Sequence, residues 1–440
     1  MKDLNVYTLY PPKATASHYY RLGVQLSTAE DLGLPVKAVI DQNLADIPLM
    51  ERIQQFCEAD LVLMYQPVGE ANIQNVRGVQ SFLASKREDG WKWPPTIMME
   101  TDDNLFNVSP LNQAFKGLGV KDMNGDLIPP GHHIGIVSNG EKKVLWKDGE
   151  NGFSILKNRQ TLTTWKMLIE LADSVGCSTP AVESAVKQNA TPLRTLVHPN
   201  LVRFDHYEPV DLKENPKQIK ILWQGGVAHY EDWFPLREAL GNITRKYPEV
   251  HWVIWGAIFP WVKELIPAHR YTYKSWCPYP EYKLRLAMIG HDIALAPLQE
   301  NVFNTCRSAI KWYEASVLKK PAATLAQNSG AYQHEMEDGK TGLLFNDPQE
   351  FEDKLGLLIE NEKTRRELAS NAKDWVSEHR DAMKEVPKLV QYWEMLREEK
   401  KREQPRVSDE QWAEIAAEAE SEMEQQRKQE EAKNGALQPA

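Results

Sequence analysis

Short apolar runs of strand length recur along this chain and alternate with stretches of helical periodicity. In the first half such runs cover residues 4–9, 36–40, 61–65, 96–100 and 173–178. In the second half they cover residues 219–223, 251–255, 271–273, 293–296 and 322–325. Strand-length runs that alternate with helices are typical of a parallel sheet with helices on both faces. The sequence therefore predicts an α/β fold that contains two such layers.

The chain of 440 residues exceeds what one hydrophobic core usually supports, which favours two domains. A polar, proline-bearing segment at 204–218 is the predicted linker. We place a first Rossmann-like domain at 1–208 and a second at 209–374. The helical pattern that follows predicts one long amphipathic helix over 375–397. The charged stretch at 398–440 is expected to be helical or disordered.

The region at about 117–152 interrupts the alternation of strands and helices and is a predicted insertion. Residues 132–137 and 143–146 are strand-like, and Asn139-Gly140 between them suits the type I′ turn of a β-hairpin. A helix over 162–172 is predicted to return the chain to the α/β layer.

Charge and cysteine content exclude several classes of protein. The net charge is −10, and residues 398–440 supply half of it, with 12 acidic and 7 basic side chains. The rest of the chain has no general basic character that would indicate nucleic-acid binding. The four cysteines are scattered without a CxxC pair, which argues against a disulfide framework and a structural zinc site.

The chain begins directly in strand-like sequence, so we predict no signal peptide. Its most apolar run, at 252–261, is shorter than the about 20 residues that a helix needs to cross a bilayer. We therefore expect a cytoplasmic protein without a membrane span.

Two glycines, Gly225 and Gly226, follow the strand predicted at 219–223 and precede a helix. Glycine lets a backbone approach a ligand closely, and a helix N-terminus favours phosphate. A tight turn without a ligand explains the pair equally well. The spacing matches neither the dinucleotide GxGxxG motif nor the P-loop motif.

A second candidate site is the polar helix start at 304–315. Backbone N–H groups near Ser308, with the ammonium group of Lys311 one turn on, would suit a diphosphate. Glu314 lies three residues past Lys311 on the same helix face, where a carboxylate could accept both vicinal hydroxyls of a ribose. Spacing alone favours an ordinary Lys–Glu surface pair.

Three blocks of the second half occur in the order found in retaining GT-B glycosyltransferases of group 1, also called family 4. HDIALAPL at 291–298 resembles the D-I-x-L-x-P-L strand of that family, and KWYEASVLKKP at 311–321 resembles K-x-x-E-A-x-x-x-G-x-P. GKTGLLF at 339–345 resembles the G-x-T-G-x-L-v turn and strand. The resemblance covers roughly residues 219–396. It implies the GT-B fold, in which two Rossmann-like domains face a cleft.

The first half resembles the same family through shorter segments. ETDDNLF at 100–106 is similar to the D-D-x-L-F segment of some bacterial and phage members. SVGCSTP at 174–180 and HPN at 198–200 resemble a strand with its helix start and an i-P-N motif. A crossover helix near the C-terminus, predicted here over 375–397, is also typical of GT-B proteins.

The resemblance implies transfer of a sugar from a nucleoside-diphosphate sugar, with retention of configuration and with neither a metal nor another cofactor. Lys311, Arg307 and the N–H groups near Ser308 would hold the diphosphate, and Glu314 the ribose. The donor-binding residues implied are Gly225, Gly226, Arg307, Ser308, Lys311, Glu314, Asn328, Ser329 and Gly330. The candidate catalytic residues are Asp102, Asp103 and His229.

The match to the family is incomplete. Its paired glutamates, E-x7-E, would fall at 306 and 314, and the first position holds Cys306. Gln224 and His229 occupy the region in which an arginine and a lysine are expected. The donor sugar and its nucleotide therefore stay open. Two alternatives remain: a catalytically silent sugar-nucleotide-binding protein, and a sugar-nucleotide epimerase.

The resemblance leaves two acceptor classes, a glycan and a hydroxymethylated base in phage DNA. A DNA acceptor would require a basic surface beside the cleft. The candidates for such a surface are Lys13, Arg21, Lys86, Arg87, Arg159 and Arg194. The cytoplasm of a bacterium or of a phage-infected host is the expected location, and the oligomeric state is left open.

Overall fold

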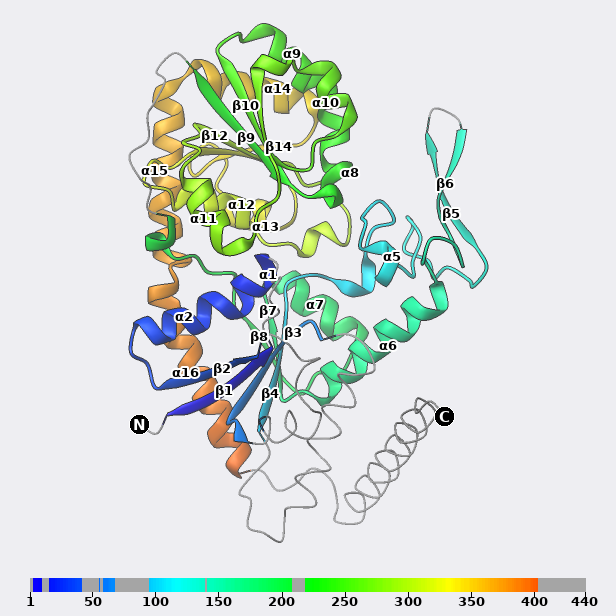
Figure 1. Ribbon diagram of the computed structural model, residues 1–440, viewed down its shortest axis with the longest axis vertical. Helices are drawn as coiled ribbons and strands as arrows, with labels where there is room; N and C mark the ends of the chain where they lie inside the picture. The colour runs from blue at the N-terminus through cyan, green and yellow to red at the C-terminus, as the bar shows by residue number, and fades with distance from the viewer. Residues whose placement is uncertain are drawn as a thin grey trace, which may run out of the picture.

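Two parallel six-stranded sheets form the framework of the protein (Figure 1). The computed structural model describes residues 3–9, 16–41, 55, 58–67, 95–138, 141–207 and 218–402. The first sheet has the order β2-β1-β3-β4-β7-β8. Its strands are β1 (Leu4–Leu9), β2 (Val36–Asp41), β3 (Leu61–Tyr65), β4 (Thr96–Thr101), β7 (Ser174–Cys177) and β8 (Thr195–Val197). The predicted α/β layer of the first half is confirmed, with β8 as a strand that the apolar pattern did not predict.

The second sheet repeats this arrangement in the order β11-β10-β9-β12-β13-β14. Its strands are β9 (Ile219–Gly225), β10 (Val250–Gly256), β11 (Tyr271–Lys274), β12 (Ile293–Ala296), β13 (Ala323–Gln327) and β14 (Leu343–Phe345). In each sheet the strand order reverses next to the first strand, between β1 and β3 and between β9 and β12. Crevices beyond the carboxyl ends of strands at such a reversal are the usual ligand sites of open α/β sheets.

The first half carries helices and a hairpin in addition to its sheet. Figure 1 shows the hairpin projecting from the body of this half, with α6 leading back to the sheet. These elements are α1 (Ala16–His18), the π-helical turn η1 (Tyr19–Gly23), α2 (Val24–Asp31), η4 (Leu105–Asn107), α5 (Phe115–Leu118), β5 (His133–Ser138), β6 (Glu141–Lys147), α6 (Ile155–Leu171), α7 (Pro180–Asn189) and η5 (Phe204–Tyr207). The predicted hairpin is confirmed, although its turn at 139–140 lies outside the described residues.

The helix predicted over 162–172 begins earlier than the sequence pattern indicated. It starts at Ile155, because the Ser154 hydroxyl caps it by accepting a hydrogen bond from the N–H of Lys157. The buried side chains of this first turn, such as Ile155, pack under the hairpin rather than on the sheet.

The helices of the second half surround its sheet on both faces (Figure 1). They are η6 (Val227–His229), α8 (Tyr230–Trp233), η7 (Phe234–Leu236), α9 (Arg237–Lys246), α10 (Pro260–Leu265), η8 (Ala268–Arg270), α11 (Tyr279–Ala287), η9 (Asn304–Cys306), α12 (Ile310–Ser316), α13 (Gly330–Glu335) and α14 (Pro348–Glu360). Most of the predicted linker, at 208–217, lies outside the described residues.

The prediction of a single helix over 375–397 is wrong, because two helices divide that range. α15 (Glu362–His379) ends and α16 (Ala382–Arg402) begins after a break at Arg380 and Asp381. There the N–H of Val202 donates to the carbonyl of Arg380, and the N–H of Ala382 donates to the carbonyl of Val202, each at 2.9 Å. The amphipathic sequence pattern continues through the break. It could not predict the break, because the break depends on these bonds to the distant first half.

The break is the point at which the chain returns to the first half. α15 lies along the second half, and α16 packs against α2 and β4 of the first (Figure 1). α16 extends through Arg402. The rest of the predicted tail lies outside the described residues. Among the helices described, none is long and apolar enough to cross a membrane.

A buried ion pair ties η1 to the sheet of the first half. Arg21 and Glu100 are fully buried, and the Arg21 Nε atom donates to a Glu100 carboxylate oxygen at 3.1 Å. His198 Nε2 lies 3.0 Å from the same carboxylate. Burial alone would raise the pKa of Glu100, but His198 and Arg21 together hold that pKa below its usual value. Gly176 leaves the space that this carboxylate occupies, because a Cβ there would lie 2.5 Å from its oxygens.

Substitution of Gly176 tests this cluster. The methyl group of Gly176→Ala would displace the Glu100 carboxylate from its positions against Arg21 and His198. We therefore expect the free energy of unfolding to fall by about 1–3 kcal/mol. Gly117→Ala is the matched control, because a Cβ at Gly117 meets nothing within 4 Å. Urea denaturation of both variants measures the effect. Equal stability of the two variants would contradict the role given to Gly176.

Candidate functional site

A cavity of about 310 Å³ lies between the carboxyl edges of the two sheets. Its wall in the first half is formed by Ala16, Ser17, Tyr20, Asp102, Asp103 and Asn200. Gln224 at the end of β9 and Pro297 just past β12 contribute to the wall in the second half. The cavity therefore sits at the strand-order reversal of the second sheet, where open α/β sheets bind ligands.

Glu314, on α12, is a buried carboxylate in the cavity wall. It accepts hydrogen bonds from the Tyr20 hydroxyl at 2.6 Å, the Tyr282 hydroxyl at 2.8 Å and Gln224 Nε2 at 3.0 Å. Burial raises the pKa of Glu314, and these three donors oppose the rise. Because Tyr20 belongs to the first half, the carboxylate joins the two halves across the cavity.

Lys311, Arg307 and His229 form a cationic end of the cavity. His229 Nδ1 lies 2.6 Å from the Asp232 carboxylate, and Nε2 lies 3.4 Å from Lys311 Nζ and 3.5 Å from Arg307 Nη1. Burial and the nearby Lys311 lower the pKa of His229 to about 4. The neutral ring donates its Nδ1 proton to Asp232 and turns the lone pair of Nε2 toward the two cations.

Burial lowers the pKa of Lys311 to about 8, although the nearby Asp232 carboxylate opposes this change. Lys311 therefore carries its charge at neutral pH. Arg307 is charged at every accessible pH. Two positive charges and a neutral imidazole consequently face the same space, an arrangement suited to an anion that carries more than one negative charge.

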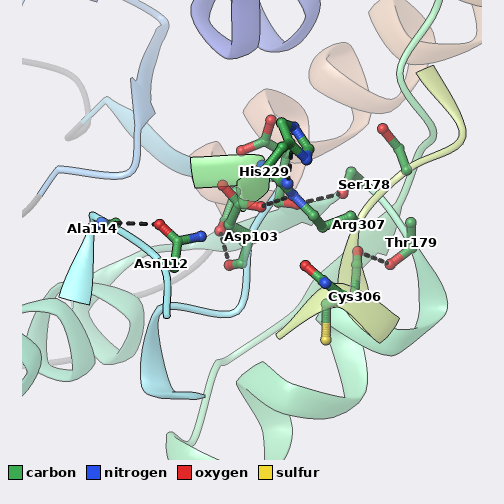
Figure 2. A network of polar contacts seen from close by, with 12 residues as sticks. Asp103, Asn112, Ala114, Ser178, Thr179, His229, Cys306 and Arg307 are labelled. Carbon is green, nitrogen blue, oxygen red and sulfur yellow. Dashed lines mark hydrogen bonds and ion pairs between the residues drawn. The ribbon is translucent and has the colours of Figure 1, made fainter. Parts of the chain in front are cut away.

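Asp102 and Asp103 face this cationic end from the first half. Figure 2 shows Asp103 and Arg307 beside His229, and the Asp103 carboxylate lies 3.6 Å from Arg307 Nε. Burial and the neighbouring Asp102 raise the pKa of Asp103 to about 6. Asp102 accepts a hydrogen bond of 2.5 Å from the Tyr65 hydroxyl. The predicted candidates Asp102, Asp103 and His229 thus lie together.

Gly225 and Gly226 both line the cavity. A Cβ at Gly225 would lie 2.7 Å from Cδ2 of His229, so glycine lets the imidazole pack directly on the end of β9. A Cβ at Gly226 would meet nothing within 4 Å. Ser308 also lines the cavity, where its hydroxyl accepts a hydrogen bond from Asn200 Nδ2 at 3.0 Å.

Asn328, Ser329 and Gly330 are not among the residues that line the cavity. The Ser329 hydroxyl donates to the carbonyl of Leu298, and Asn328 Nδ2 donates to the Asn346 side chain. Gly330 has φ +53°, and a Cβ there would lie 2.8 Å from the carbonyl oxygen of Asn304. Glycine at 330 therefore lets the start of α13 pack against the backbone around Asn304, while Tyr332 of the same helix lines the cavity.

Cys306 lies at the contact between the halves and does not line the cavity. It is buried in a cluster whose other members belong to the first half. Its carbonyl accepts a hydrogen bond of 2.9 Å from the Thr179 hydroxyl (Figure 2). Burial raises the pKa of its thiol to about 11. In this chain the position of the family's first glutamate thus serves an apolar contact between the halves.

Several residues of the site carry no local sequence signal. Tyr282 of α11 and Trp255 of β10 line the cavity, and Asp232 of α8 orients His229 without lining it. Tyr20 also reaches the cavity from the first half, next to Asn200 of the HPN segment. They converge only because the carboxyl edges of the two sheets meet, which single-sequence motifs do not encode.

The arginines considered for DNA contact do not line the cavity in the part of the chain that the structure describes. Arg21 is fully buried against Glu100, and Arg159 donates to the carbonyl of Ile128. Arg194 forms an ion pair of 2.5 Å with Glu399 of α16. The other three candidates, Lys13, Lys86 and Arg87, lie outside the described residues. The described side chains also contain no group of three or more His, Cys, Asp or Glu residues placed to hold a metal ion.

Comparison with known proteins gives matches in structure alone. No family model and no curated protein matches the sequence. HepE of Anabaena, solved with UDP and glucose, has a TM-score of 0.55 at 13% identity, over 89% of this chain and 100% of that one. A glycosyltransferase of Rickettsia africae has a TM-score of 0.57 at 10% identity, over 90% and 99%.

A candidate UDP-N-acetylglucosamine 2-epimerase of Listeria monocytogenes has a TM-score of 0.50 at 9% identity, over 90% of this chain and 97% of that one. These matches span nearly the whole chain, so they concern both sheets and the way in which they face each other. The chain therefore has the GT-B fold and is structurally similar to GT-B glycosyltransferases.

Proposed function

We propose that this protein transfers a sugar from a nucleoside-diphosphate sugar to an acceptor hydroxyl in the cavity between its sheets. The observation that carries the proposal is the joint placement of Arg307, Lys311 and Glu314 around one cavity at a strand-order reversal. Two cations suit a diphosphate, and an acceptor-only carboxylate suits the vicinal hydroxyls of a ribose. The structural matches include a glycosyltransferase and a protein solved with UDP and glucose.

The diphosphate would lie against Lys311 and Arg307. Arg307 now faces the Asp103 carboxylate at 3.6 Å, so an incoming phosphate oxygen competes with Asp103 for the guanidinium. His229, held by Asp232, lies beside both cations and would contact the same phosphate group. Binding of this anion would release Asp103 toward the acceptor side of the cavity.

Catalysis would rest mainly on charge. As the bond from the sugar to the diphosphate breaks, negative charge grows on the leaving phosphate, and Lys311 and Arg307 stabilise it in a partly buried site. Asp103, whose pKa is raised to about 6, would accept the proton of the acceptor hydroxyl near neutral pH. Retention of the anomeric configuration, which the resemblance to group 1 enzymes implies, requires the acceptor hydroxyl to attack the oxocarbenium-like sugar from the side that the diphosphate leaves, next to Asp103.

The acceptor we propose is a glycan. The three described arginines considered for DNA are buried or bonded to other parts of the protein, so they supply no basic surface beside the cavity. An epimerase would use the same donor without an acceptor, and the matched Listeria structure makes it the alternative to exclude. A transferase releases nucleoside diphosphate only when it glycosylates an acceptor or when water hydrolyses the donor in place of the acceptor.

Donor binding is the first test. We expect Lys311→Ala to raise the Kd for the preferred nucleotide sugar about 10- to 100-fold, because a charge-assisted hydrogen bond to phosphate is lost. Glu314→Gln should weaken binding through the ribose while it preserves the side-chain volume. Calorimetry with UDP-, GDP- and dTDP-sugars measures both effects. Lys319→Ala is the control that should bind as the wild type does, because this exposed lysine lies past the C-terminal end of α12 and does not line the cavity. Unchanged affinity in both cavity variants would place the donor elsewhere.

The pH dependence of kcat/KM tests the charges assigned to the cavity. Asp103 is a carboxylate only above its pKa of about 6, and Lys311 is an ammonium only below its pKa of about 8. We therefore expect a bell-shaped profile that falls below pH 6 and above pH 8. Lys311→Arg should remove the alkaline limb, because a guanidinium stays charged there. A profile that is flat between pH 5 and pH 9 would refute the assignment.

The acceptor class has a direct test. We expect no gel-shift of hydroxymethylated duplex DNA at low salt, where phosphate contacts are strongest. Release of nucleoside diphosphate should instead rise when oligosaccharide acceptors are added. A retarded band that disappears as salt is raised would favour the DNA acceptor. Interconversion of the donor sugar with no diphosphate released would favour the epimerase.

A further inference from the structure

The cavity has two chemically different ends. Lys311, Arg307 and the aspartates make one end charged. The other end is aromatic, and it is lined by Trp255, Trp276 and Tyr282. Glu314 stands between them, because it is one turn from Lys311 on α12 and accepts a hydrogen bond from Tyr282. The two tryptophans have no part in the binding and catalytic roles proposed above for the charged end.

The aromatic end is held in place by an ordered set of contacts. The ring centroids of Tyr282 and Trp255 are 4.9 Å apart, and Trp255 is buried. Trp255 Nε1 donates to the carbonyl of Ser275 at 3.0 Å. This bond anchors the segment between β11 and α11 next to Trp276. The aromatic end is thus connected, contact by contact, to the carboxylate of Glu314.

Trp276 is the exposed member of this group. Its residue is 66% exposed, although it lines the cavity. Gly256, with φ +100°, ends β10 below it, and a Cβ at Gly256 would lie 3.6 Å from Cε3 of the indole. A large apolar ring left in water costs solvation free energy, and exposed apolar surface in a concave site commonly marks ligand contact.

Followed along these contacts, from Lys311 through Glu314 to the aromatic rings, the order of groups is charge, carboxylate and aromatic ring. A nucleoside diphosphate presents its parts in the matching order of phosphates, ribose and base. With the diphosphate at Lys311 and the ribose at Glu314, the base would extend toward the aromatic end. We propose that Trp276 stacks on the nucleobase of the donor and supplies affinity that is largely independent of which base is present. This inference rests on the proposed donor site.

Stacking depends little on which base is present, because every base has a π-face. It contributes about 1–3 kcal/mol of binding free energy per base. Removal of the ring should therefore weaken nucleotide binding about 5- to 100-fold. A ligand without a base should not respond. Phenylalanine keeps an aromatic face at this position and should restore most of the affinity, which a purely structural role of the indole would not require.

The test uses the full chain and calorimetry with UDP, GDP, dTDP and inorganic pyrophosphate. For whichever nucleotides bind the wild type, Trp276→Ala should raise the Kd about 5- to 100-fold, and Trp276→Phe should stay within a few-fold. The Kd for pyrophosphate should be the same in all three proteins. Leu284→Ala, an exposed apolar residue of α11 outside the cavity lining, is the matched control.

The outcomes separate this inference from the proposed function. Equal nucleotide affinity in the wild type and in Trp276→Ala overturns the stacking role and leaves the donor site intact. Equal weakening of pyrophosphate and nucleotide also overturns it, because the indole would then act on the diphosphate end or on the fold. A wild-type protein that binds none of the four ligands overturns the proposed function together with this inference.

Discussion

A buried carboxylate must be surrounded by donors, and the way in which Glu314 meets this requirement determines the shape of the site. Two of its donors, Tyr282 and Gln224, belong to the second half, and Tyr20 belongs to the first. The bond from Tyr20 therefore forms only when the halves face each other. The bond between Thr179 and Cys306 and the return of α16 hold them in that relation. A bound ribose would donate its own hydroxyls to the Glu314 carboxylate in place of the hydroxyls of Tyr20 and Tyr282.

The charged end of the cavity is built on a similar balance. Asp232 holds the one ring proton of His229 on Nδ1, and burial together with Lys311 keeps the imidazole neutral beside the two cations. Lys311 and Arg307 are partly buried, and the Asp103 carboxylate of the opposite wall offsets some of their charge. Under the proposed function, a diphosphate would replace that carboxylate and give the cations a stronger partner.

Local sequence patterns predicted the strands well, because a strand buried in a parallel sheet is a continuous apolar run, as in residues 293–296. The same patterns failed at the break near Arg380, which depends on bonds to Val202 in the distant first half. The motif placed Lys311 and Glu314 in the site, whereas Asn328 to Gly330 turned out to lie beside it. Tyr20, Asp232 and Trp276 were missed, since only the three-dimensional meeting of the two sheets brings them together.

The central claim is that one cavity orders the parts of a nucleotide sugar, with the diphosphate at Lys311 and Arg307 and the ribose at Glu314. A crystal structure of the protein with UDP tests it most directly. We expect phosphate oxygens within hydrogen-bond distance of both cations and ribose hydroxyls on the Glu314 carboxylate. A nucleotide bound outside this cavity, or bound inside it with the phosphates away from Lys311 and Arg307, would contradict the account.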